Sequence, residues 1–217
     1  MKKNDKVELV SNELDKMFEN PRCELNYSKD YELLLAVMLS AQTTDKRVNE
    51  VTGPLFKEFD TLEKLDSLSI KEIEEAIKSI GMYKQKAKHF KEIVSEIKKK
   101  GFVPNDREYL MTLPGVGRKT INVVLSNLFN EPAIAVDTHV DRVSKRLGFA
   151  KENDSVLEVE NKLMKAFPKE RWSRLHHQMV LFGRYKCKAI NPECLNCPFL
   201  GICKERRKNY NLTRTKD

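Results

Sequence analysis

Residues 113–124, "LPGVGRKTINVV", place two glycines and a lysine in a short turn ahead of a helical apolar pattern. The residues just before the turn, "DREYLMT", have helical character as well. Pro114 sets one backbone dihedral, while Gly115 and Gly117 permit positive φ angles and a close approach to the backbone. The sequence therefore predicts two helices joined by a tight turn, and the second helix is expected to begin at about Gly117.

A glycine turn of this kind can bind an anion. The unpaired N–H groups at the start of the second helix and the positive end of its dipole both favour a phosphate. We expect a helix-hairpin-helix motif at about residues 107–128, which holds a DNA backbone without reading its sequence. A purely structural turn is the alternative. The expected DNA contacts in the motif are Leu113, Gly115, Val116, Gly117 and Arg118.

Lys119 falls in the first turn of the second helix, where the helix dipole disfavours a cation. The dipole, the neighbouring Arg118 and partial burial all disfavour the charged form of this amine. Because a neutral amine is a nucleophile, the position suggests covalent catalysis. A lysine that binds phosphate is the alternative interpretation.

Asp137 lies eighteen residues further on, in "VDTHVDRV", and starts another helical pattern. It could simply cap that helix. A carboxylate is a poor base for an ammonium group, so its more natural catalytic role is electrostatic. It would stabilise positive charge that develops on a sugar during cleavage of a C–N bond.

Four of the five cysteines crowd into residues 187–203, "CKAINPECLNCPFLGIC". A structural zinc site usually has two short cysteine pairs, and only Cys194 and Cys197 form one here. The wider spacings to Cys187 and Cys203 favour a [4Fe–4S] cluster, with zinc as the alternative. Nearby Lys186 and Lys188 could contact DNA, or their charge could simply offset that of the thiolates.

Helical spacing of apolar residues recurs through most of the chain, and strict alternation is nearly absent. The segment "YELLLAVMLSAQ" is apolar on all sides, which indicates a helix buried at the centre of a bundle. Further helices are expected near residues 45–59, 137–147, 155–167 and 171–184. Ser155 and Glu158 form a capping box at the start of the third of these. Pro54 should kink or divide the helix of residues 45–59. "AIAV" at 133–136 could be a very short strand. The fold class is therefore all-α.

The chain has 217 residues, and 40 Lys and Arg against 32 Asp and Glu give a formal net charge of +8. This excess favours a polyanionic partner, although surface lysines also serve solubility.

No apolar run approaches the ~18 residues of a membrane span, and "MKKNDKVELVSNEL" lacks the apolar core of a signal peptide. We expect a cytosolic protein without a membrane partner.

"LPGVGRKT", "AVDTHVDRV" and the cysteine pattern, in this order and spacing, resemble the endonuclease III family of DNA glycosylases and AP lyases. With "LLAVMLSAQTTD" and "IGMYKQKAKH", the resemblance extends from about residue 30 to residue 203. It implies two lobes with a DNA groove between them. A six-helix barrel domain would span residues 23–132, and a cluster domain would combine residues 1–22 with 133–217, its cluster loop being 187–203.

The resemblance also implies a chemistry, because Lys119 and Asp137 match the family's nucleophile and its aspartate. An oxidised or ring-saturated pyrimidine would be flipped out of double-stranded DNA. Lys119 would attack C1′ and displace the base, and β-elimination through a Schiff base would nick the strand. Abasic sites would be substrates too. The implied protein is a monomeric base excision repair enzyme of prokaryotic type, located in the cytoplasm with the nucleoid.

Family members fill the gap left by the flipped base with side chains, and Gln42 and Met82 lie in the matching loops. Gln42 could instead be a turn residue and Met82 a core residue; related sequences often have leucine at the second position. His139 could contact a phosphate near the lesion or stabilise the start of its own helix.

Two rival functions are compatible with parts of this pattern. The first is a metal-stabilised DNA-binding module without catalysis. The second is a monofunctional glycosylase, such as the related adenine-mismatch enzymes, which lack a lysine at this position and carry a further C-terminal domain. The presence of Lys119 and a chain of 217 residues count against the second rival.

Overall fold

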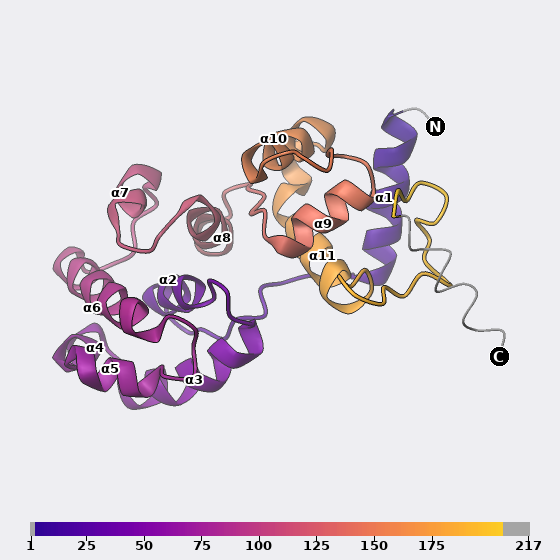
Figure 1. The fold of residues 1–217 in the computed structure, drawn as a ribbon. Coiled ribbons are helices and arrows are strands. Elements are labelled where there is room, and N and C mark those ends of the chain that lie inside the picture. The colour runs from indigo at the N-terminus through magenta and orange to yellow at the C-terminus, as the bar shows by residue number, and fades with distance from the viewer. Residues whose placement is uncertain (1–2, 206–217) are drawn as a thin grey trace. The chain divides into compact units, whose positions relative to one another are not determined.

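A computed structural model describes residues 3–205, and within them every regular element is a helix. The all-α prediction is therefore confirmed. The chain divides into two compact units (Figure 1): one comprises residues 23–130, and the other joins the segment before Cys23 to the segment from Glu131 onward. The basic segment after Glu205, which belongs to the expected cluster domain, lies outside the described residues.

The unit of residues 23–130 is built from consecutive helices around α2 (Figure 1). Every residue of α2 after Asp30 is buried, which confirms the predicted core helix. Both α6 and α8 pack against α2. The bounds of the helices are α2 Asp30–Leu39, α3 Asp45–Glu58, α4 Leu62–Ser67, α5 Ile70–Ala76, α6 Tyr83–Lys100, α7 Arg107–Thr112 and α8 Arg118–Phe129.

Helix starts in this unit follow from local side-chain chemistry. The hydroxyl of Thr44 accepts a hydrogen bond from the amide of Arg47 and caps α3, and the carboxylate of Asp106 caps α7 through the amide of Tyr109. Pro54 lies inside α3, which runs on without being divided, so the expectation of a division at this residue was wrong. Its missing N–H removes only one bond from the helix.

The other unit contains α1 (Lys3–Met17), α9 (Thr138–Arg146), α10 (Val156–Ala166), the 3₁₀ turn η1 (Lys169–Arg171) and α11 (Trp172–Tyr185). The three later α-helices confirm the predictions near 137–147, 155–167 and 171–184, and Ser155 and Glu158 form the expected capping box. Residues 133–136 are buried but form no strand, because the surrounding elements offer only helices.

Buried contacts join the N-terminal helix to the C-terminal part of this unit. Val10 and Leu14 of α1 share one apolar core with Phe182 of α11. The carboxylate of Asp15 adds bonds to Arg171 at 3.0 Å and to Arg174 at 2.7 Å. These charge-assisted bonds hold the pKa of Asp15 well below its usual range.

None of the helices in the described part of the chain is both long and apolar enough to span a bilayer.

Candidate active site and cysteine loop

The predicted hairpin lies between α7 and α8. Gly117 is the N-cap of α8, and Gly115 has a φ of +73°, in the left-handed region that favours glycine. The imidazole of His89 lies directly beneath Gly115, so a Cβ atom there would fall 2.5 Å from Nδ1. Both the backbone angle and the close contact therefore require glycine at this position.

The five expected DNA contacts of the hairpin differ in what they can present. The side chains of Leu113 and Val116 are buried within the unit, at 4% and 5% exposure. They stabilise the turn, and only their backbone groups could reach a phosphate. Gly115, Gly117 and Arg118 are exposed. The hairpin thus presents backbone amides and one cationic side chain.

Lys119 is the second residue of α8 and is partly exposed. Its neighbour Thr120 is buried, which fixes the orientation of this first helical turn against the rest of the unit. The first-turn amides of an α-helix have no partner within the helix. Lys119 therefore belongs to a helical turn whose amides can bind a phosphate or a developing oxyanion.

Asp137 is the N-cap of α9, and its Oδ1 accepts hydrogen bonds from the amides of His139 at 2.9 Å and Val140 at 2.8 Å. Asp137 therefore caps α9, which is one of the two roles considered from the sequence. Both bonds use the same oxygen, and the charge of the carboxylate is not consumed by capping. Asp137 belongs to the unit of α9 and Lys119 to the unit of α8, so each is placed within its own unit.

His139 stands on the first turn of α9 and is half-buried against Gly183 of α11. Burial lowers the pKa of its imidazole, and the nearby Asp137 acts in the opposite direction. Burial therefore favours the neutral ring. The Nδ1 atom of His139 lies 3.2 Å from Nη2 of Arg142.

Gln42 and Met82 share an unusual backbone conformation. Their φ angles are +56° and +58°, values that residues other than glycine adopt rarely. Gln42 is exposed, and the side chain of Met82 is 55% exposed, which excludes core packing for Met82. Strained residues of this kind persist where the surrounding structure enforces them, and they are frequent in functional sites.

Lys86 is a functional candidate that the motifs did not reveal. It lies one turn after Met82 on α6 and is only 4% exposed. Its ammonium group donates to main-chain and side-chain oxygens on both sides of Gln42. The helical spacing of Lys86, Phe90, Ile93 and Ile97 places the lysine on the apolar face of α6, a signal that could have identified it.

The four clustered cysteines line one cavity after the end of α11, together with Phe182 and Arg146. None of the four forms a disulfide bond. Burial raises the pKa of the Cys197 thiol to about 11, and the other three cysteines act on it in the same direction. Among residues 3–205, no set of His, Cys, Asp and Glu side chains is grouped tightly enough to hold a single metal ion.

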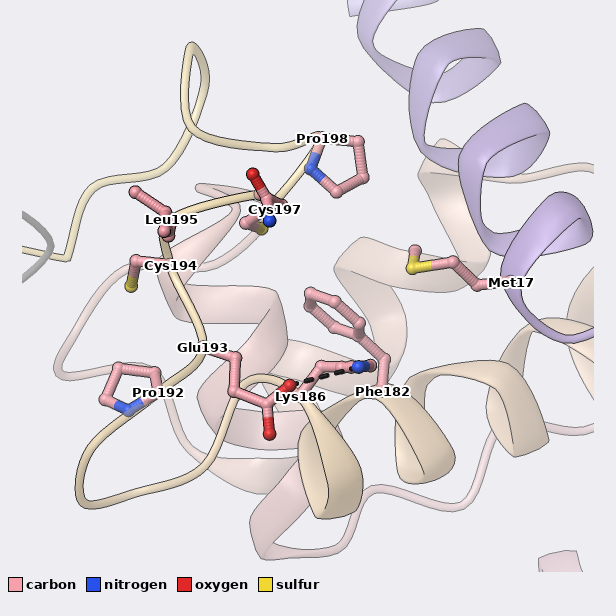
Figure 2. A pocket seen from close by; sticks show the side chains of 10 residues that line it. Met17, Phe182, Lys186, Pro192, Glu193, Cys194, Leu195, Cys197 and Pro198 are labelled. Carbon is pink, nitrogen blue, oxygen red and sulfur yellow. Dashed lines mark hydrogen bonds and ion pairs between the residues drawn. The ribbon is translucent and has the colours of Figure 1, made fainter. Parts of the chain in front are cut away.

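Figure 2 shows Cys194 and Cys197 on a loop that borders a neighbouring pocket, which Phe182 and Met17 also line. The buried Arg146 of α9 fixes the start of this loop. Its guanidinium donates to Sγ of Cys187 at 3.3 Å and to the carbonyl of Lys188 at 2.8 Å. Burial raises the pKa of the Cys187 thiol, and the guanidinium of Arg146 opposes that shift.

Lys186 and Lys188 are exposed, but Glu193 lies between them and pairs with each ammonium at 3.0 Å. Figure 2 shows the pair between Lys186 and Glu193 at the edge of the pocket. These exposed ion pairs are weak. A phosphate could displace the carboxylate, but the positive charge of the loop is smaller than the two lysines alone suggest.

Comparison with known proteins identifies relatives along nearly the whole chain. Residues 35–169 match the family model described as HhH-GPD superfamily base excision DNA repair protein. Endonuclease III of Bacillus subtilis (strain 168) is 50% identical over 204 residues, which is 93% of each chain.

Solved structures give the same result. A trapped covalent intermediate of endonuclease III with DNA matches with a TM-score of 0.91 and 50% identity, and covers 97% of this chain and 100% of that one. A non-covalent endonuclease III–DNA complex matches with a TM-score of 0.91 and 49% identity, over 98% of this chain and 100% of that one.

The family model covers more than half of the chain, and the Bacillus relative matches it at half of the aligned positions across nearly its full length. The resemblance seen in the sequence motifs is thereby confirmed. The matched superfamily, HhH-GPD, comprises base excision DNA repair proteins. Within it, the chain belongs to the endonuclease III family, and the members of this family are DNA glycosylases with AP lyase activity.

Proposed function

We propose that Lys119 is the nucleophile of this enzyme and that its substrates are oxidised or ring-saturated pyrimidines and abasic sites in double-stranded DNA. The observation that carries the proposal is a partly exposed lysine on the first turn of α8, which follows the glycine hairpin in the sequence. The covalent complex formed by the related endonuclease III supports it, since such a complex requires a nucleophile of the protein.

The proposed reaction starts with flipping of the damaged nucleotide, which requires less free energy when a saturated ring stacks poorly. The neutral amine of Lys119 attacks C1′, the C1′–N bond to the base breaks, and the base departs with the bonding electrons and takes up a proton. The new ammonium nitrogen loses a proton, the C1′–O4′ bond breaks, and O4′ is protonated as the sugar ring opens to a protonated Schiff base. This Schiff base acidifies the C2′ proton. Loss of that proton expels the 3′ phosphate by β-elimination, and water then releases the lysine.

Asp137 would act through its charge. As the C1′–N bond breaks, positive charge develops on the sugar, and a carboxylate held at the start of α9 stabilises it. The two amide hydrogen bonds to Oδ1 fix the carboxylate before substrate arrives. Fixed orientation is what makes such electrostatic stabilisation effective, because no reorganisation is needed during the reaction.

Gln42 and Met82 would fill the gap that the flipped nucleotide leaves in the duplex. Exposure and left-handed backbone conformations at both positions support this role. The groups that would contact the DNA backbone are the hairpin amides, Arg118, His139, Lys186 and Lys188.

We assign residues 23–132 to the barrel domain and residues 1–22 with 133–217 to the cluster domain of a monomeric, cytoplasmic enzyme associated with the nucleoid.

Cys187, Cys194, Cys197 and Cys203 would hold a [4Fe–4S] cluster. The donor set fits, because four cysteines that form no disulfide line one cavity, and Arg146 supplies a cationic donor to one of them. When bound, such a cluster would cross-link the loop 187–203 to the end of α11 and so stabilise the unit.

Elemental analysis tests the cluster assignment. Protein purified without oxygen should contain about four iron and four sulfide per chain, as a [4Fe–4S] centre requires. Cys194→Ser should lower both contents and the melting temperature, because a buried site that lacks one ligand destabilises the fold. One zinc ion per chain without sulfide would instead support the zinc alternative.

Borohydride trapping tests the proposed function. The wild-type protein is incubated with a duplex that contains one thymine glycol, and borohydride is added to reduce any Schiff base. We expect a covalent protein–DNA adduct, and a nicked strand when borohydride is omitted. Tight binding without an adduct or a nick would mean that the protein is a DNA-binding module.

A further inference from the structure

Lys86 is a buried cation on α6, and its ammonium group is hydrogen-bonded to residues outside that helix. Its ammonium donates to the carbonyl of Leu39 at 2.8 Å, to the carbonyl of Ala41 at 2.6 Å and to Oγ1 of Thr43 at 3.2 Å. These three partners are uncharged oxygens, and a lysine ammonium has three protons to donate. Burial lowers the pKa of Lys86. The bonds that compensate for its desolvation all go to residues 39–43.

The partners of Lys86 enclose Gln42. Leu39 is the last residue of α2, and Ala41 and Thr43 are the direct neighbours of Gln42 in the chain. The ammonium therefore fixes the backbone on both sides of an exposed residue that has a positive φ angle. A cation at the C-terminal end of α2 also interacts favourably with the helix dipole.

The main chain of Lys86 is bonded to the second strained residue. Its amide donates to the carbonyl of Met82 at 3.0 Å in the first turn of α6. Lys86 thus bonds to Met82 through its main chain and to the residues on either side of Gln42 through its ammonium group. Because α2 packs against α6, this link lies on a rigid support and not on a free loop.

We propose that Lys86 is a positioning residue that holds Gln42 and Met82 at a fixed separation, so that both side chains can enter the duplex as the damaged nucleotide leaves. This inference rests on the proposed function of Gln42 and Met82. It assigns Lys86 to nucleotide flipping and not to bond cleavage. Loss of its ammonium should therefore affect substrates that must be flipped more than substrates that are already unpaired.

The test uses Lys86→Met in the full-length protein, which keeps most of the stem and removes the donor. Base release is measured in single turnovers on two duplexes, one with thymine glycol opposite adenine and one with the same lesion opposite an abasic site. We expect release from the paired lesion to slow by about tenfold or more, since unpairing requires a few kcal/mol, and release from the unpaired lesion to change by less than about twofold.

A fluorescent base provides an independent measurement. When 2-aminopurine stands opposite the lesion, its emission should rise as the wild-type side chains enter the stack, and Lys86→Met should reduce the rise. Lys91→Met is the matched control, because Lys91 lies on the same helix and donates to the main chain of Asp66 in α4, away from Gln42 and Met82. It should leave both measurements within about twofold of the wild type.

Thr43→Val is a milder variant that leaves Lys86 in place and removes one of its three partners. It should give the same preference between the two duplexes with a smaller amplitude, and it remains informative if Lys86→Met does not fold. Equal slowing on both duplexes, or no slowing on either, would overturn the inference.

Gln42→Ala and Met82→Ala separate this inference from the proposed function on which it rests. If neither substitution slows release from the paired lesion, the proposed insertion of these side chains is wrong. If they slow it and Lys86→Met does not, only the role of Lys86 is wrong. In the Gln42→Ala, Met82→Ala background, Lys86→Met should add less than about twofold, because it acts through those two residues.

Discussion

Replacement of Lys119 by alanine is expected to reduce base release and strand cleavage by at least about 10³-fold, because it removes the group that forms the covalent bond. The borohydride adduct should disappear with both activities. The substitution lies on a partly exposed turn of α8, so the melting temperature should change little. Activity is measured in single turnovers on a thymine glycol duplex, and the adduct is quantified on a denaturing gel.

Arg118→Ala is the control for this prediction. Arg118 is the neighbouring cation on the same turn of α8, so its loss tests whether charge alone explains the effect. We expect Arg118→Ala to weaken DNA binding while adduct formation at saturating enzyme persists. If Lys119→Ala merely weakened binding in the same way, the lysine would be a phosphate ligand and not the nucleophile.

Asp137→Asn is expected to slow base release by about 10²-fold, which corresponds to about 3 kcal/mol of transition-state stabilisation. Asparagine caps a helix about as well as aspartate, so the amide bonds to His139 and Val140 should survive. The substitution therefore removes the charge and keeps the cap. Single-turnover base release and the free energy of unfolding are measured side by side.

Asp106→Asn is the matched substitution, because Asp106 caps α7 through the amide of Tyr109 in the same manner. It should alter neither base release nor stability by a large factor. Should Asp137→Asn leave base release at the wild-type rate, Asp137 would be only a helix cap.

Elements defined by local chemistry could be predicted from the sequence. The uninterrupted apolar run of α2, the capping box at Ser155 and the glycines before α8 each depend on residues within one turn of each other. The same holds for the candidate nucleophile, because its position relative to Gly117 fixes it on the first turn. Pro54 shows the limit of local rules, since it lies inside a continuous α3.

Features that depend on distant contacts could not be predicted. A non-glycine residue with a positive φ angle has no sequence signal of its own, so the sequence does not predict the conformations of Gln42 and Met82. The place of Lys86 on the apolar face of α6 can be predicted from its helical spacing, but its bond to Leu39, 47 residues away, cannot. The pairing of Lys186 and Lys188 with Glu193 likewise depends on how the loop folds back.

The identity of the nucleophile is the central claim, and mass spectrometry of the reduced adduct tests it most directly. The wild-type protein is trapped on a thymine glycol duplex with borohydride, digested with a protease and a nuclease, and sequenced by fragmentation. We predict that the deoxyribose remnant is attached to Nζ of Lys119. A remnant on any other side chain, or a peptide containing an unmodified Lys119 in every trapped molecule, would contradict the assignment.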